Sequence, residues 1–197
     1  MIDANTNSVI TTIALSGKPE FEVSDNNGKI YVNIEDKNLI SVINTSDLKV
    51  EKSWSISPGE EPSGLAIDNT THRLFSFCDN KKMVVVDALS GKIIATSLIG
   101  ERVDGCAFDT ESKRVFSSNG EGTVTFIQEE SPAKFSVLEN IPTQKGARTI
   151  CIDNKTHHLY LPTAEYGEAP APDAAHPHPR PSIKPGTFII LDIVEQQ

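Results

Sequence analysis

Hydrophobic residues occur along this chain in short runs that alternate with polar turns. Four segments share one pattern, in which a short apolar strand leads through an aspartate-initiated turn into a second strand. They read PEFEVSDNNGKIYVN from Pro19, PSGLAIDNTTHRLFS from Pro62, VDGCAFDTESKRVFS from Val103 and ARTICIDNKTHHLYL from Ala147. The turn residues Asp25, Asp68, Asp109 and Asp153 follow one another at spacings of 43, 41 and 44 residues, and each carboxylate can accept backbone hydrogen bonds within its turn. The chain is therefore built from an internal sequence repeat.

Each unit continues into further strands. A third strand follows a polar turn, as in LISVIN from Leu39, MVVVDA from Met83 and TVTFIQ from Thr123, and a fourth follows in KVEKSWSI, IIATSLI and KFSVLENI. No helical periodicity interrupts this order. Four short strands in about 40 residues are typical of a β-propeller blade, whereas solenoids of this period are helical or carry one strand per repeat. The sequence therefore predicts an all-β chain of about four blades, each a four-stranded antiparallel sheet, as one domain over residues 1–197.

The two ends of the repeat do not match. Residues 8–15, SVITTIAL, predict an additional strand before the first unit, and the last unit has strands near TICID, HLYLPTA and TFIILDI but no fourth. The additional strand is available to complete the last blade, because an unpaired sheet edge invites aggregation. Either the chain is a small four-bladed ring, or it is the C-terminal portion of a larger one.

Several phrases point to a known repeat family. GKIYVNIEDKNLISVINT, GEEPSGLAID, MVVVDALSGKIIAT and GARTICIDNKTHHLYLPTAEYG resemble the YVTN-type (YncE-like) β-propeller repeat proteins, and the similarity covers essentially the whole chain. Members of that family are generally seven-bladed and exported, commonly to the bacterial periplasm. The resemblance implies that further blades and a signal peptide precede this segment, and that the protein is periplasmic or secreted, although Met1 to Gly17 do not read as a signal peptide.

Composition excludes some classes of function. The net charge is −9 and the pI is near 5.0, which argues against a surface that follows the phosphates of nucleic acid. No run of 18 apolar residues is present, so no membrane span is expected. Cys78, Cys106 and Cys151 form no CxxC pair and have apolar neighbours, so we predict buried free thiols.

The residues just before the first strand of each blade line the mouth of a propeller channel. By the repeat these are Glu20, Ser63, Asp104 and Arg148. Two carboxylates, a hydroxyl and a guanidinium can bind a small polar ligand or a cation, and carboxylates suit calcium. The competing interpretation is that these side chains are solvated, or that Arg148 pairs with a neighbouring acid.

A proline-rich stretch interrupts the last blade between its second and third strands. It runs over residues 165–186, EYGEAPAPDAAHPHPRPSIKPG, and is expected to project from one face as a loop without regular pairing. Long loops on a rigid scaffold often carry function. His176 and His178 can share a transition metal only with further ligands, and a metal-free polar loop is the simpler interpretation. The other histidines, His72, His157 and His158, occupy turns and are expected to be exposed and structural.

Aromatic residues recur at fixed positions of the repeat. Phe75, Phe116 and Tyr160 stand at one repeat position, and Trp54 lies in a fourth strand. We expect all of them to pack between adjacent blades, because aromatics at a repeat position are usually core.

The sequence favours a non-enzymatic scaffold that binds a protein, a peptide or a small ligand. No nucleophile elbow, HExxH motif or phosphate loop is present, and no cofactor is predicted apart from the calcium considered above. One alternative is a lactonase-like, calcium-dependent hydrolase with Glu20 and Asp104 at the metal, by analogy with unrelated propellers. Another is DNA binding, which has been suggested for relatives and is opposed here by the negative charge.

Overall fold

The computed structural model describes residues 1–173, 177 and 179–194. Within these residues the regular structure is almost entirely strand, with one short 3₁₀ turn, η1 (Glu35–Lys37), and no α-helix. The first sheet contains β3 (Pro19–Ser24), β4 (Lys29–Ile34), β5 (Leu39–Asn44) and β6 (Lys49–Ser55). The second contains β7 (Pro62–Asp68), β8 (Arg73–Cys78), β9 (Lys82–Asp87) and β10 (Ile93–Leu98). The third contains β11 (Val103–Asp109), β12 (Arg114–Asn119), β13 (Thr123–Ser131) and β14 (Lys134–Pro142), and the fourth contains β15 (Cys151–Asp153), β16 (His158–Thr163) and β17 (Ile189–Ile193).

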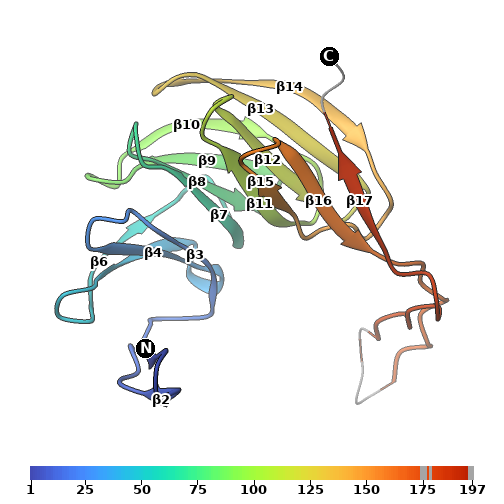
Figure 1. Ribbon diagram of the computed structural model, residues 1–197, viewed down its shortest axis with the longest axis horizontal. Coiled ribbons are helices and arrows are strands. Elements are labelled where there is room, and N and C mark those ends of the chain that lie inside the picture. The colour runs from blue at the N-terminus through green and yellow to red at the C-terminus, as the bar shows by residue number, and fades with distance from the viewer. Residues whose placement is uncertain (174–176, 178, 195–197) are drawn as a thin grey trace.

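Every sheet is an antiparallel meander whose strands pair in chain order. The first strands β3, β7, β11 and β15 contact one another in succession, and the sheets follow one another around an arc with the first and fourth at its two ends (Figure 1). This arrangement is that of propeller blades around an axis and confirms the all-β, four-sheet prediction. No helix in the described part of the chain is long and apolar enough to cross a membrane.

Apolar side chains fill the three spaces between neighbouring sheets. Leu74 of β8 faces the first sheet and Phe75 faces the third, because successive residues of a strand point to opposite faces. Phe75 and Phe116 are buried as predicted. Tyr31 stands at the same repeat position in β4, and its hydroxyl donates to the carbonyl of Ala88 in the second sheet at 3.0 Å. Tyr160 is only half-buried, because it faces away from the third sheet at the end of the arc.

Trp54 of β6 packs between the first two sheets, as predicted. Its ring stacks on Tyr31 with centroids 6.1 Å apart and lies against Gly91 in the turn before β10. Gly91 has φ +76°, and a Cβ there would lie 2.4 Å from the Trp54 ring. The turn therefore needs glycine both for its backbone conformation and for space.

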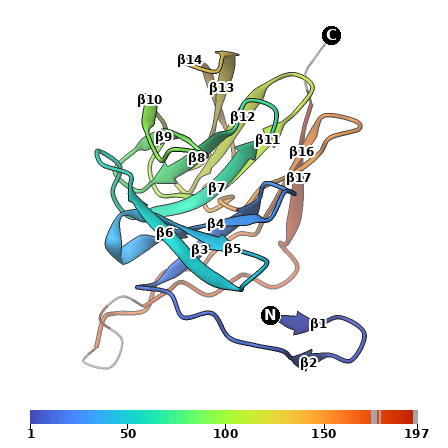
Figure 2. The ribbon, with the colours of Figure 1, turned by 90° about the vertical axis from the view of Figure 1, so that its left-hand side faces the viewer.

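The N-terminal segment does not complete the last blade, contrary to the sequence prediction. Ser8–Val9 (β2) pairs with Ile2–Asp3 (β1) in a small hairpin that stands apart from the sheets (Figure 2). Ile13 and Leu15 then pack against the outer face of the first sheet. That face carries Val32 and other apolar residues that would otherwise meet water, so the segment stays at the near end of the arc and the fourth sheet has three strands.

The stretch 165–186 lies between β16 and β17. Its base is more regular than its prolines suggested, since Tyr166 and Ile183 form an antiparallel bridge. The amide of Gly167 donates to Ser182 at 2.8 Å and that of Lys184 donates to Glu165 at 2.9 Å. The residues His176 and His178 lie outside the described residues.

The three thiols are free, but they are not all buried. Cys78 is buried, and Cys106 is half-buried with its sulfur against Gly64. Cys151 is exposed, which corrects the prediction. Its repeat equivalents Ala66 and Ala107 are buried beneath the following sheet, whereas Cys151 lies on the outward face of the last one.

Candidate functional site

Two of the aspartate turns, those of Asp68 and Asp109, also join their sheet to the next one. Asp68 accepts hydrogen bonds within its turn from the Thr70 amide at 2.8 Å and the Thr71 hydroxyl at 3.0 Å. Lys113 of the third sheet adds its ammonium group at 2.9 Å. The Asp68 side chain is 1% exposed. Burial alone would raise its pKa, but the bonds from Lys113, Thr70 and Thr71 outweigh burial and lower the pKa.

Asp109 repeats this arrangement one sheet further on. Its carboxylate accepts the Glu111 amide at 2.9 Å and the Ser112 hydroxyl at 2.8 Å, and Nδ1 of His157 from the fourth sheet lies 2.7 Å away. Burial would raise the pKa of Asp109, and the bonds from Ser112, Glu111 and His157 outweigh it and lower the pKa.

The two side chains that reach these aspartates occupy one repeat position. Each stands four residues after the turn aspartate of its own sheet. Lys113 and His157 both have left-handed backbone there, with φ 56° and 62°. His72 has the same position and φ 55°. The histidines were predicted to be exposed turn residues, and the sequence analysis missed the contact of His157 across the sheet boundary. The sequence does contain a signal for this contact, since His157 and Lys113 stand at the same distance after the preceding aspartates.

Three of the four predicted mouth residues lie together. The Ser63 hydroxyl donates to the Asp104 carbonyl at 3.2 Å, and Arg148 Nε lies 3.7 Å from the Asp104 carboxylate. Side-chain exposure is 51% for Arg148 and 28% for Asp104, so the ion pair is partly solvated. This is the pairing of Arg148 with a neighbouring acid that the sequence analysis considered as the simpler interpretation.

Glu20 is engaged elsewhere. Lys18 lies 2.8 Å from its carboxylate and also contacts Glu35. The hydrogen bonds that the Lys18 ammonium group donates to Glu20 and then to Glu35 raise the pKa of Lys18. Glu20 and Asp104 thus each face a cationic side chain of the protein. Among the described residues, no group of three or more His, Cys, Asp or Glu is placed to hold a metal ion.

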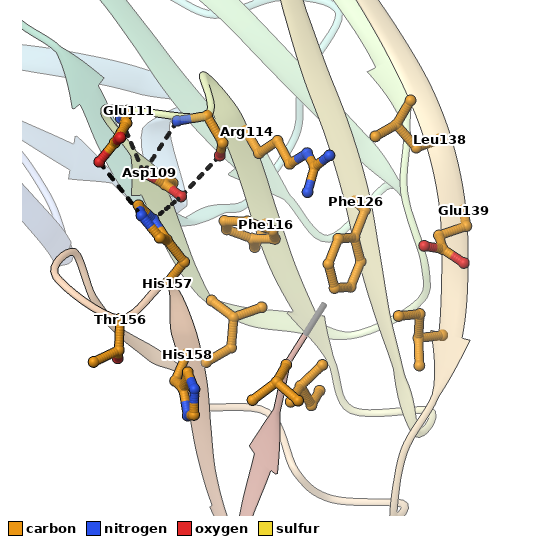
Figure 3. Close-up of a pocket in the computed structure, with 15 residues that line it drawn as sticks. Asp109, Glu111, Arg114, Phe116, Phe126, Leu138, Glu139, Thr156, His157 and His158 are labelled. Atoms are coloured by element: carbon orange, nitrogen blue, oxygen red, sulfur yellow. Dashed lines mark hydrogen bonds and ion pairs between the residues drawn. The ribbon is translucent and has the colours of Figure 1, made fainter. Parts of the chain in front are cut away.

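A cleft of 1110 Å³ lies between the third and fourth sheets, and sequence reasoning did not find it. Figure 3 shows Phe116 and Phe126 on its floor, with Glu111 and His157 at one side and Glu139 at the other. The rings of Phe116 and Phe126 meet edge to face, with centroids 5.0 Å apart. The other lining residues are Asp109, Ser112, Arg114, Leu138, Ile141, Thr156, His158, Leu159, Ile193 and Val194.

The cleft opens where the fourth sheet, in the described part of the chain, has no fourth strand. Leu138 of β14, the outer strand of the third sheet, is 50% exposed and lines this space. Phe126 is half-buried, while Val85, which occupies its repeat position in β9, is fully buried. Apolar side chains therefore line the cleft beside charged ones, which is the usual composition of a binding site.

Two carboxylates flank His157 in this cleft. Its Nδ1 atom faces Asp109, and its Nε2 atom lies 3.4 Å from the Glu111 carboxylate. The hydrogen bond to Asp109 is the main cause of a raised pKa, which favours the imidazolium form. An imidazole with a carboxylate at each nitrogen is poorly placed to accept a proton from a nucleophile. The Ser112 hydroxyl beside it bonds to Asp109.

Comparisons with known proteins identify the fold. No family model matches the sequence, and no curated protein is significantly similar to it. A chain of Kuenenia stuttgartiensis hydrazine synthase superposes with a TM-score of 0.67 at 14% identity, covering 77% of this chain and 43% of that one. A chain from the crystal structure of a mitotic checkpoint complex gives 0.60 at 12% identity, covering 69% and 44%. At these identities the likeness shows a propeller-type fold, and the chain spans less than half the length of either neighbour.

Proposed function

We propose that the chain is a non-enzymatic binding scaffold of the YVTN-type propeller repeat class, and that it holds a protein or peptide segment in the cleft between its third and fourth sheets. The observation that carries this proposal is the cleft itself, 1110 Å³ in volume, with Phe126 and Leu138 open to it and charged side chains at its sides.

The arrangement of the polar groups supports binding rather than catalysis. His157 bonds to two carboxylates, and Asp104 at the channel mouth faces Arg148. The resemblance of the repeats to an exported family adds the proposal that binding takes place in the periplasm or outside the cell. The mouth residues Ser63 and Asp104 remain a second candidate surface for a small polar ligand.

The test is a selection of peptides from a random display library on the purified chain. Affinities of the selected peptides are then measured for Leu138→Asp and for Val137→Asp. Both residues are exposed and adjacent in β14, but Leu138 lines the cleft and Val137 does not. The proposal predicts that Leu138→Asp weakens binding at least about tenfold, or about 1.4 kcal/mol, while Val137→Asp leaves it unchanged.

Two results contradict the proposal. If no selected peptide distinguishes Leu138→Asp from Val137→Asp, the cleft is not the binding site. If the peptides instead lose affinity for Asp104→Asn or Arg148→Ala, binding takes place at the channel mouth.

A further inference from the structure

The last strand of the fourth sheet has a free edge within the described part of the chain. β17 pairs with β16 on one side. In the other three sheets the third strand also pairs with a fourth, namely β5 with β6, β9 with β10 and β13 with β14. Backbone groups along such an edge are available to another strand. Ile193 and Val194, at the end of β17, also line the cleft, so the free edge and the cleft adjoin.

The cleft lies where the side chains of a fourth strand pack in the other sheets. The core between the first and second sheets includes Ile93 from β10, and the core between the second and third includes Phe135 from β14. The core between the third and fourth sheets has no described member from a fourth strand of its later sheet. Phe126 and Ile193, which line the cleft, are among the residues of that core that are left partly exposed.

The sides of the cleft carry negative charge. Its lining has three carboxylates, those of Asp109, Glu111 and Glu139, against one guanidinium, that of Arg114, and the imidazole of His157. The side chain of Glu111 is 80% exposed, and Glu139 is also exposed. The whole chain has a net charge of −9. A basic segment is therefore attracted to this cleft and a second copy of this chain is repelled.

We propose that the free edge of β17 binds an extended, basic segment of a partner protein as the fourth strand of the last sheet. Backbone hydrogen bonds to β17 hold the segment antiparallel, and its apolar side chains on one face fill the cleft over Phe126 and Leu138. This inference rests on the function proposed above and adds the conformation and charge of the bound segment.

The test uses a probe taken from the repeat itself. A fluorescein-labelled peptide of residues 91–100, GKIIATSLIG, has the sequence of the second sheet's fourth strand, contains Lys92 and has no acidic residue. A matched peptide carries N-methyl groups on alternate amides, which blocks strand pairing and leaves the side chains in place. Anisotropy titrations are expected to show saturable binding of the first peptide and at least about tenfold weaker binding of the second. Leu138→Asp is expected to weaken the first peptide similarly, and Val137→Asp is not.

Hydrogen exchange supplies an independent measurement. Bound peptide is expected to slow the exchange of alternate amides of β17. If the N-methylated peptide binds equally well and β17 gains no protection, strand addition is overturned while the proposed function stands. If neither this probe nor any library peptide binds in the cleft, the proposed function fails as well.

Charge and self-association have their own controls. A Lys92→Glu peptide is expected to bind more weakly, and equal binding overturns the basic character of the segment. Light scattering is expected to show a monomer. If the chain forms a dimer that is lost when residues 1–12 are removed, a second copy supplies the fourth strand of the last sheet. That result would overturn the proposal of a separate partner protein. Ile13 and Leu15, which pack on the first sheet, stay in that shortened chain.

Discussion

Nδ1 of His157 lies 2.7 Å from the carboxylate of Asp109, across the boundary between the third and fourth sheets. One boundary earlier, the ammonium group of Lys113 lies 2.9 Å from Asp68. The two contacts are equivalent in the repeat, but lysine keeps its charge throughout the physiological range and histidine does not. The boundary beside the cleft is therefore the one whose strength depends on pH.

We predict that the unfolding temperature of the wild-type chain falls as pH rises above neutrality, and that His157→Lys reduces this fall. Asp109 raises the pKa of His157 in the folded state, so the ion pair stabilises fully below the unfolded value of about 6.5. Its contribution is lost as pH rises through the raised folded pKa. Glu111 and Asp153 also face His157 and act in the same direction.

Thermal melts between about pH 5.5 and 8.5 measure this effect, because this window begins below the ordinary histidine pKa of about 6.5 and extends well above it. His72→Lys is the matched control, since His72 shares the repeat position and backbone conformation of His157. The interpretation fails if the wild-type chain and His157→Lys show the same pH dependence.

Replacement of the turn aspartates separates a local role from a role between sheets. Asp68→Ala is expected to cost about 2–4 kcal/mol, because it removes charge-assisted hydrogen bonds in a buried setting and leaves Lys113 unpaired. Asp153→Ala removes only the equivalent bonds within its own turn, to Lys155 and Thr156, and is expected to cost much less. Denaturant unfolding of both variants measures the difference, and equal losses would show that the turn alone matters.

The repeat explains how much of this fold could be predicted. Aspartate spacing and strand alternation identify the four sheets because these features are local and recur. The path of residues 8–15 could not be predicted in this way. The apolar residues of this segment can cover any exposed sheet face. Val32 and its neighbours in the first sheet are closer to the segment along the chain than β17 is.

The channel-mouth residues also show which contacts the repeat pattern can predict and which it cannot. The repeat brings Ser63, Asp104 and Arg148 to one end of adjacent strands, and in the structure Ser63 and Arg148 both contact Asp104. Glu20 shares their repeat position but bonds to Lys18, two residues away. The cleft depends on a strand that one sheet lacks, so the repeat pattern itself contains no motif for it.

Alanine substitution at two glycines distinguishes the cost of backbone strain from the cost of steric crowding. Gly91 and Gly186 have nearly the same φ, +76° and +75°, so alanine at either site costs about 1–2 kcal/mol of left-handed strain. A Cβ at Gly91 also meets the Trp54 ring, whereas nothing lies within 4 Å of one at Gly186. We expect Gly91→Ala to lose about 1–3 kcal/mol more than Gly186→Ala. Equal losses in chemical denaturation would mean that Trp54 moves away without cost.

Thiol labelling tests the difference between an inner and an outer sheet face. Cys151 is exposed on the outward face of the last sheet, while burial raises the pKa of the Cys78 thiol to about 12. Burial also raises the pKa of Cys106, whose sulfur lies against Gly64. Since the thiolate is the reactive form, we predict one fast-reacting thiol per native chain with an aromatic disulfide reagent, and three after denaturation.

Cysteine variants assign the reactive thiol. Cys151→Ser is expected to abolish the fast phase and Cys78→Ser to leave it intact. If Cys78 and Cys151 react at the same rate in the native chain, the core between the first two sheets opens freely. The sheets would then not form a rigid framework for the cleft. Protection of Cys78 together with rapid labelling of Cys151 would show that the inner faces are closed and that the outward face of the last sheet is open to solvent.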